Sequence, residues 1–236
     1  VKTGSGAFMK CVEESEALAK AMVEIGNAAG RDTVAVITTM DIPLGNAVGN
    51  SLEVIEAVET LKGNGCEDLT TVCIELASNM LTLVTGKDKA TCVEMAKGAI
   101  ADGSALNKLK EMVSEQGGNP EWIADTSLFP KAEHSFEIKA ESDGYICSMD
   151  AEKIGVASLL LGAGRNTKED VLDFSAGIIL KAKTGDRIEK GKTIAVLYAN
   201  DETKFESASQ KFNEAVGFST DPVEKQPLIY SVIREK

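Results

Sequence analysis

The stretch Met40-Asp-Ile-Pro-Leu-Gly-Asn-Ala-Val-Gly-Asn50, with its two flanks, decides the fold predicted for this chain. The apolar, β-branched run at residues 33–39 precedes it and predicts a buried, parallel strand. Residues 51–62 follow it and predict a helix, with Leu52 and Ile55 on one face. Open α/β sheets place ligands beyond the carboxyl ends of their strands. The loop is therefore a candidate site, although most strand-to-helix connections carry no chemistry.

Composition narrows the classes of function. The 236 residues, 43% hydrophobic and 26% charged, predict a globular protein of one or two domains. The net charge of -12 argues against a nucleic-acid partner, and no apolar stretch approaches the roughly 18 residues of a membrane span. Five cysteines without a Cys-x-x-Cys pair, and a single histidine, make a zinc site unexpected. The odd cysteine count fits a reducing, cytoplasmic setting.

The pattern of predicted elements changes along the chain. Amphipathic helices accompany the strand up to residue 118 and predict an α/β domain at 1–118. Residues 119–133 carry the only tryptophan and two of the five prolines, which is typical of a linker. Short alternating strands with two helices then predict a small α+β domain at 134–236, closed by a strand at 228–234.

Details of packing follow from the same patterns. The turn Ser142-Asp143-Gly144 predicts a hairpin between the strands at 135–140 and 144–148. His134 is expected to have a structural or surface role. Apolar stripes at helical spacing predict the core faces of the helices at 14–29 and 67–85, and these stripes are Leu18, Ala21, Met22 and Ile25 in the first and Leu69, Val72, Cys73, Leu76 and Met80 in the second.

Three stretches in order carry a resemblance to a known family. The first is Val1-Lys-Thr-Gly-Ser-Gly-Ala-Phe-Met9. The second is the loop from Met40 to Asn50 with Leu52-Glu-Val-x-Glu-Ala57. The third is Gly162-Ala-Gly-Arg165, followed by Ala176-Gly-Ile-Ile-Leu and Lys183-x-Gly-Asp186. Together they resemble the thymidine and pyrimidine-nucleoside phosphorylases, which are pentosyltransferases. The resemblance implies the later part of a mixed-sheet α/β domain with flanking helices, followed by a hammerhead-like α+β domain. It also implies a pyrimidine nucleoside and inorganic phosphate as substrates, and a homodimer when the protein is complete.

The resemblance also implies that this chain lacks part of the enzyme. The family's Lys-x-Ser-Thr-Gly-Gly phosphate loop with its neighbouring His, and the Arg and Lys that hold the pyrimidine, have no counterpart here. We therefore assign no catalytic residue in this chain and expect it to be inactive alone. An unpaired apolar edge of its strand at 33–39 is expected to favour association.

The N-terminal motif borders the nucleoside in this family. The resemblance places Phe8 near the base and turns Lys2 toward the cleft. A core Phe8 and a structural or solvated Lys2 are the alternatives. Backbone amides of the turn Gly4-Ser5-Gly6 suit an anion at a helix start.

Bacterial members of this family bind potassium through main-chain oxygens and one carboxylate, and they use no organic cofactor. The matching positions are the carbonyls of Leu44 and Ala47 and the side chain of Glu56. Gly45 and Gly49 allow the loop to curl so that carbonyls converge, as weakly hydrated cations require. The remaining ligands lie in the family's phosphate-loop region, outside this chain.

Glu53 is the alternative to Glu56 as the carboxylate ligand of this cation. It follows Asn50, the predicted N-cap, by three residues and has the spacing of a capping box. A third possibility is that Glu56 is an ordinary solvated carboxylate on the helix.

Two other classes of function share features of the sequence. Residues 183–192 resemble a biotinyl or lipoyl carrier barrel, but neither Met-Lys-Met nor Asp-Lys-Ala, which would hold the acceptor lysine, occurs. A phosphoribosyltransferase would need a diphosphate–metal motif, which we do not find. The sequence leaves open whether uridine or thymidine is preferred.

Overall fold

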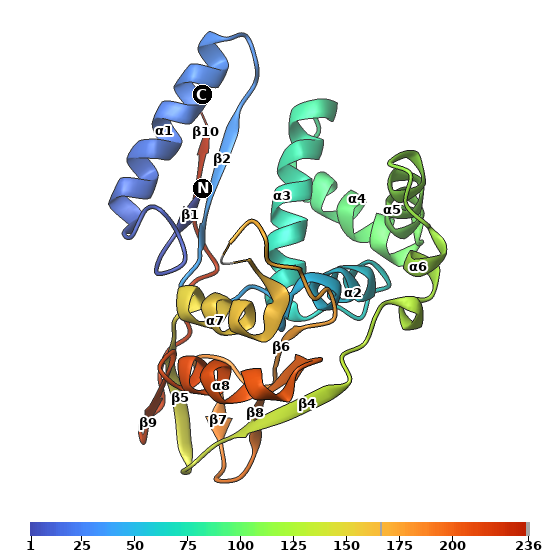
Figure 1. Ribbon diagram of the computed structural model, residues 1–236. Coiled ribbons are helices and arrows are strands. Elements are labelled where there is room, and N and C mark those ends of the chain that lie inside the picture. Colours follow the sequence, from blue (N-terminus) through green and yellow to red (C-terminus); the bar gives the residue numbers. More distant parts are fainter. Residues whose placement is uncertain (166, 235–236) are drawn as a thin grey trace. The chain divides into compact units, whose positions relative to one another are not determined.

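The computed structural model describes residues 1–165 and 167–234, and its contacts divide the chain into two compact units (Figure 1). Unit 1 contains Val1–Met40, Glu59–Pro120 and the residues from Pro227 onward. Unit 2 contains Asp41–Val58 and Glu121–Gln226. The mixture of helices and sheets confirms the predicted class, an α/β domain followed by a small α+β domain.

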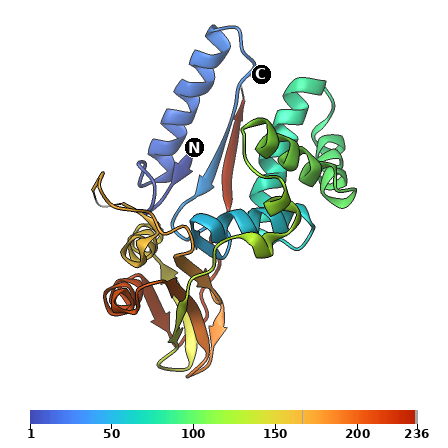
Figure 2. The same ribbon diagram turned by 45° about the vertical axis from the view of Figure 1, so that its right-hand side comes forward.

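A three-stranded mixed sheet forms the centre of unit 1. Its order is β1 (Lys2–Thr3), β2 (Val34–Thr39) and β10 (Ile229–Arg234). The predicted strand at 33–39 is β2, which runs parallel to β1 and antiparallel to β10. Figures 1 and 2 both show β10 beside β2, although the two strands lie far apart in the sequence.

The helices of unit 1 begin and end close to the predicted positions. Gly86 ends one of them with φ +67°, and Asp88 caps the next by accepting a hydrogen bond of 2.9 Å from the Thr91 amide. The helices that begin in unit 1 are α1 (Val12–Ala28), α3 (Glu67–Thr85), α4 (Lys89–Ala101) and α5 (Ser104–Glu115). Among the described residues no single helix is long and apolar enough for a membrane span, whereas α3 and α4 pass that test only together, with a bend of 118°.

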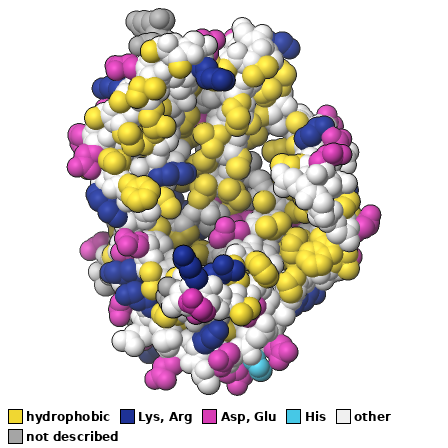
Figure 3. Space-filling view, turned by 45° about the horizontal axis from the view of Figure 1, so that its top comes forward, with side chains coloured by type: hydrophobic (Ala, Val, Ile, Leu, Met, Phe, Trp, Pro, Cys, Tyr) yellow, Lys and Arg dark blue, Asp and Glu magenta, His cyan; other side chains and the backbone are white. Residues whose placement is uncertain are grey.

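The predicted core face of α1 is wrong. Ser15, Ala19 and Val23 are the buried residues of this helix, whereas Met22 and Ile25 are 52% and 69% exposed. The small side chains at every fourth position allow the helix to approach the sheet closely. The large apolar side chains lie beside this buried stripe and not within it, and hydrophobic side chains are visible at the surface of the upper part of Figure 3.

We expect Val23→Ala to destabilise unit 1 by about 1.5–3 kcal/mol, because it removes two buried methyl groups and leaves a cavity. The matched change Ile25→Ala on the exposed face should alter stability by less than about 0.5 kcal/mol. Urea denaturation of the two variants measures this difference. Equal losses of stability would show that α1 does not bury the face with Val23 in preference to the face with Ile25.

The apolar stripe predicted for α3 is buried only in part. Val72 is buried, but Cys73 is exposed and Met80 is 60% exposed, so the prediction that Cys73 lies in the core is wrong. A polar network occupies the neighbouring surface of the helix. Asn79 accepts a hydrogen bond from the Arg234 guanidinium and donates to the Glu75 carboxylate at 2.7 Å.

Glu75 connects three elements of unit 1 through this network. Its carboxylate also accepts a bond of 2.8 Å from the Lys89 ammonium at the start of α4. Burial raises the pKa of Glu75, but the hydrogen bonds from Lys89 and Asn79, with the charges of Lys89 and Arg234, outweigh it and lower the pKa below the ordinary 4.5. The ionised form of Glu75 therefore stabilises unit 1.

We expect Glu75→Gln to cost about 1–3 kcal/mol at neutral pH, because it leaves a half-buried ammonium without its charged partner. The folded pKa of Glu75 is depressed, so this contribution is present above pH 4.5 and is lost as the pH falls through the folded pKa. Thermal unfolding at pH 7 and at pH 3 measures the change. Glu94→Gln, which removes an exposed ion pair with Lys97, is the control and should have little effect at either pH.

Unit 2 contains two small antiparallel sheets, the beginning of the helix α2 (Asn50–Leu61) and two further main helices. The helix α7 (Ala151–Ser158) is capped by Asp150, which accepts a hydrogen bond of 3.1 Å from the Lys153 amide, and it continues into the π-helix η2 (Leu159–Ala163). The other main helix is α8 (Phe205–Asn213). The first sheet has the order β3 (Ala47–Gly49), β6 (Gly177–Leu180), β8 (Thr193–Ala199), β4 (His134–Lys139), and the second has the order β7 (Arg187–Ile188), β5 (Gly144–Met149), β9 (Val216–Ser219).

The predicted hairpin at residues 142–144 does not form. β4 pairs with β8, whereas β5 pairs with β7 and β9 in the other sheet. The turn therefore carries the chain from one sheet to the other, so that both sheets pack around a shared core that includes Ile146, Ile178 and Leu197. His134 lies at the start of β4, 38% exposed, with its Nδ1 3.1 Å from a carboxylate oxygen of Glu202.

The two compact units do not coincide with the domains predicted at 1–118 and 134–236 or with the linker predicted at 119–133. Residues 41–58 belong to unit 2, because β3 pairs with β6. The C-terminal strand belongs to unit 1, because β10 pairs with β2. The segment expected as a linker contains two short helices, α6 (Glu121–Ala124) and η1 (Thr126–Leu128), and another short helix, η3 (Glu202–Lys204), precedes α8.

Candidate functional site

The loop at residues 41–49, which we call the carbonyl loop, connects β2 to α2 (Asn50–Leu61), as the sequence predicts. Its last residues form the short strand β3, which the sequence did not indicate. Ala47 pairs with Ile179, and the Leu180 amide donates to the Asn46 carbonyl at 2.8 Å. The end of the loop is thereby held on the first sheet of unit 2.

Two glycines permit this pairing. A Cβ on Gly49 would lie 2.7 Å from the Ala176 carbonyl oxygen, and a Cβ on Gly177 would lie 2.6 Å from the Val48 carbonyl oxygen. Their φ angles of +148° and +155° also disfavour any residue with a side chain. The Val48 carbonyl accepts a further bond of 2.8 Å from the Ser158 hydroxyl in α7. Close backbone contact therefore fixes the position of β3.

Glu56 reaches back from α2 to the loop. Its two carboxylate oxygens accept hydrogen bonds from the Asn46 amide at 2.7 Å and from the Ala47 amide at 3.1 Å. Gly45 adopts φ +77°, and a Cβ there would lie 2.3 Å from Glu56 Oε2. The carboxylate thus lies against the curled loop and is hydrogen-bonded to its backbone.

Glu53 has a different position, at the start of α2. Its Oε1 accepts a hydrogen bond of 2.9 Å from the Gly49 amide. The prediction that Asn50 acts as the N-cap is wrong, because Asn50 is already helical and its side chain donates to the Ala163 carbonyl at 2.7 Å. Glu53 therefore stabilises the helix start, and Glu56 is the carboxylate at the carbonyl loop.

The cation ligands predicted in this loop are all oxygen atoms. The described part of the chain contains no group of three or more His, Cys, Asp or Glu side chains that could hold a metal ion. The candidate ligands are two main-chain carbonyls, of Leu44 and Ala47, and one anchored carboxylate, of Glu56. Oxygen donors with a single negative charge fit a weakly hydrated cation such as potassium.

Lys183 is a contact of this loop to which the sequence analysis gave no role. Its ammonium donates to the Pro43 carbonyl at 3.2 Å, from the segment that follows β6. The Lys183 amide donates to Asp186 Oδ2 at 2.9 Å, and Asp186 Oδ1 accepts from the Lys225 ammonium at 3.0 Å. The motif Lys183-x-Gly-Asp186 marked this position, but only the fold brings it to Pro43.

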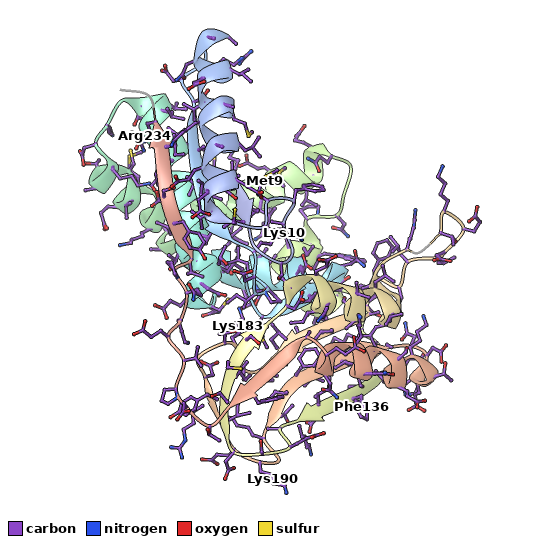
Figure 4. All side chains as sticks on the ribbon, turned by 90° about the vertical axis from the view of Figure 1, so that its left-hand side faces the viewer. Met9, Lys10, Phe136, Lys183, Lys190 and Arg234 are labelled. Carbon is purple, nitrogen blue, oxygen red and sulfur yellow. The ribbon has the colours of Figure 1, made fainter. Side chains whose placement is uncertain are left out.

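The two candidate substrate residues have different surroundings. Phe8 is fully exposed, so the alternative that it belongs to the core is wrong. Lys2 lies next to α3, where burial lowers the pKa of its amine and the charge of Cys73 opposes this shift. Cys73 is exposed as a residue, but partial desolvation of its thiol by neighbouring side chains raises the pKa of that thiol. Met9 and Lys10, which follow Phe8, are labelled in Figure 4.

The turn at Gly4-Ser5-Gly6 does not offer the anion cradle that we considered. The Gly4 amide donates to the Met9 carbonyl at 3.1 Å, and the Gly6 amide donates to the Met40 carbonyl at 3.0 Å. The Ala7 amide donates to the Gly4 carbonyl at 3.0 Å. These amides instead hold the turn itself together.

Unit 1 also has a pocket of about 560 Å³ between β10 and the helices α3 and α4. No candidate residue of the sequence analysis lines it. Apolar side chains and hydroxyls share its wall, which includes Thr60, Thr70, Ile74, Glu75, Val93 and Ile229.

Comparison with known proteins places these features in a family. Residues 1–106 match the model of the glycosyl transferase family a/b domain, and residues 145–219 match that of the pyrimidine nucleoside phosphorylase C-terminal domain. A pyrimidine-nucleoside phosphorylase from Geobacillus stearothermophilus is 44% identical over 237 residues, which are 99% of this chain and 54% of that protein. The chain belongs to the pyrimidine-nucleoside phosphorylase family. Relatives with the same name from Staphylococcus epidermidis and Staphylococcus aureus USA300 are 45% and 43% identical, over 100% of this chain and 54% of each relative.

The two ranges that match family models include the candidate substrate residues, the carbonyl loop and Lys183. The matched range 1–106 contains Lys2, Phe8 and the carbonyl loop with Glu56. The matched range 145–219 lies within unit 2 and contains Lys183. The chain spans about half the length of the curated relatives that it matches.

Proposed function

We propose that this chain is the C-terminal part of a pyrimidine-nucleoside phosphorylase. In the complete protein, inorganic phosphate displaces the base from C1′ of a pyrimidine nucleoside or deoxynucleoside. The products are the free base and ribose 1-phosphate or deoxyribose 1-phosphate. The observation that carries this proposal is the 44–45% identity, over the whole chain, with relatives named for this activity.

The carbonyl loop is proposed as the part of a potassium site that this chain supplies. Leu44 and Ala47 would bind the cation through their carbonyls, and Glu56 would bind it through its carboxylate. The position of Glu56 against the loop and its hydrogen bonds to the loop backbone support this assignment. A bound cation would supply the positive charge that ties this loop to the phosphate-binding segment of the complete enzyme.

Phe8 and Lys2 are proposed to border the nucleoside. The full exposure of Phe8 supports this role, because its ring is accessible for contact with a pyrimidine. Lys2 would then contribute a positive charge beside the nucleoside and the attacking inorganic phosphate.

Catalysis in the complete enzyme depends mainly on how the protein positions phosphate and the nucleoside. Its transition state resembles an oxocarbenium ion, so the protein must hold phosphate and the departing base and must keep water away from C1′. We assign none of the catalytic residues to this chain. The proposal includes a cytoplasmic homodimer, and the five free cysteines fit a reducing compartment.

The test joins this chain to the part of the Geobacillus stearothermophilus relative that it does not cover. Release of uracil from uridine and of thymine from thymidine is measured with and without inorganic phosphate. We expect phosphate-dependent release from at least one of the two nucleosides. Absence of release, under conditions in which the complete relative turns over, would contradict the proposed function.

A further inference from the structure

The middle of the carbonyl loop has little backbone structure of its own. The Asp41 carbonyl accepts from the Ala151 amide at 2.9 Å at one end, and Asn46 is held by Glu56 and Leu180 at the other. Residues 42–45 between these points form neither helix nor strand. A segment of this kind depends on side chains from other elements for its position.

Lys183 supplies such a side chain. It crosses from the segment after β6, is half-buried, and donates a charge-assisted hydrogen bond to the Pro43 carbonyl at 3.2 Å. The backbone at Lys183 is itself held, because its amide donates to Asp186 and the Gly185 amide donates to the Ile146 carbonyl at 2.8 Å. The ammonium group therefore has a rigid base from which to hold the loop.

We propose that Lys183 is a positioning residue for the carbonyl loop. By holding the Pro43 carbonyl, its ammonium fixes the path of the backbone into Leu44, and so keeps the Leu44 and Ala47 carbonyls in place relative to Glu56. The inference about the cation rests on the proposed function, whereas the anchoring of the loop is a property of this chain alone.

The charge of Lys183 and its positioning of the loop predict opposite effects on potassium binding when the ammonium is removed. A positive charge next to the loop repels a cation, so removal of the ammonium would strengthen potassium binding if charge were its main effect. Removal would weaken potassium binding if the positioning of the carbonyls were its main effect. Lys190 provides a matched control, because it is an exposed lysine of the same unit, and Figure 4 shows it at the opposite end of the sheets from Lys183.

The first experiment measures amide hydrogen exchange in this chain without potassium. We expect Lys183→Met to speed exchange at least tenfold at the Asn46 and Ala47 amides, which donate to Glu56, while the amides of β8 exchange as in the wild type. Lys183→Arg should retain protection, and Lys190→Met should leave it unchanged. Wild-type exchange at Asn46 and Ala47 in Lys183→Met would overturn the proposal. If the Met variant unfolds, Lys183→Gln provides the same comparison.

The second experiment uses the chain joined to the part of its relatives that it does not cover, and measures Tm against potassium chloride with choline chloride as control. We expect Lys183→Met to need at least tenfold more potassium for half of the rise in Tm, and Lys183→Arg and Lys190→Met to resemble the wild type. An unchanged or lower requirement in Lys183→Met would overturn the proposal. A wild-type Tm that potassium does not raise would instead overturn the cation site of the proposed function, and with it this role of Lys183.

Discussion

Alone, the chain is expected to release base from thymidine or uridine at least about 10³ times more slowly than the same chain joined to the part of its relatives that it does not cover. The loss of a single donor that stabilises charge in a transition state costs about 10²–10³ in rate. Here the family's phosphate loop, its neighbouring histidine and the two residues that hold the pyrimidine have no counterpart in the sequence. Their combined loss should leave no useful phosphorolysis.

The measurement compares phosphate-dependent base release by the two proteins at equal concentration. Addition of the uncovered part as a separate polypeptide tests whether the two portions also assemble without a covalent link. Turnover by the chain alone within about tenfold of a typical enzyme rate of ~10 s⁻¹ would contradict the prediction. Such a result would mean that residues of this chain perform the chemistry that we assign to the uncovered part.

Glu56→Gln is expected to abolish the potassium-dependent rise in Tm of the joined protein. Any ligand that binds only the native state raises its stability by mass action, so the rise in Tm reports the cation site. The substitution removes the negative charge. It also places an amide nitrogen near the Asn46 and Ala47 amides, which both donate to the carboxylate in the native protein. The site should therefore lose both its charge and its shape.

Glu53→Gln is the matched control, because the same substitution occurs in the same helix, three residues earlier. Glu53 accepts its hydrogen bond from the Gly49 amide, so this variant should keep the full potassium effect and lose only a little stability. If Glu53→Gln loses the effect and Glu56→Gln keeps it, the carboxylate has been assigned wrongly. If neither variant changes the effect, the potassium site lies elsewhere.

The packing of α1 shows where reasoning from periodicity reaches its limit. The helix was predicted correctly, but it carries one apolar stripe of small residues and another of large ones. Hydropathy favours the large stripe as the core face, whereas close approach to a sheet favours the small one. The structure buries Ala19 and Val23 and exposes Met22 and Ile25. Only the shape of the neighbouring sheet decides between the two stripes.

The sequence by itself determined the local elements of this protein and its family. Helix and strand periodicity, the ends of helices at residues such as Gly86 and the Asp88 cap all depend on residues a few positions apart. The curl that brings the loop against Glu56 was predictable for the same reason, because Gly45 and Glu56 lie in one continuous loop and helix.

The tertiary structure alone decided which distant segments meet. β10 joins β2 rather than the sheets of unit 2, and the turn at residues 142–144 passes between two sheets rather than forming a hairpin. Lys183 contacts Pro43 across 140 positions of the sequence. Such contacts depend on how whole elements pack and close long loops, and no local pattern of residues encodes that choice.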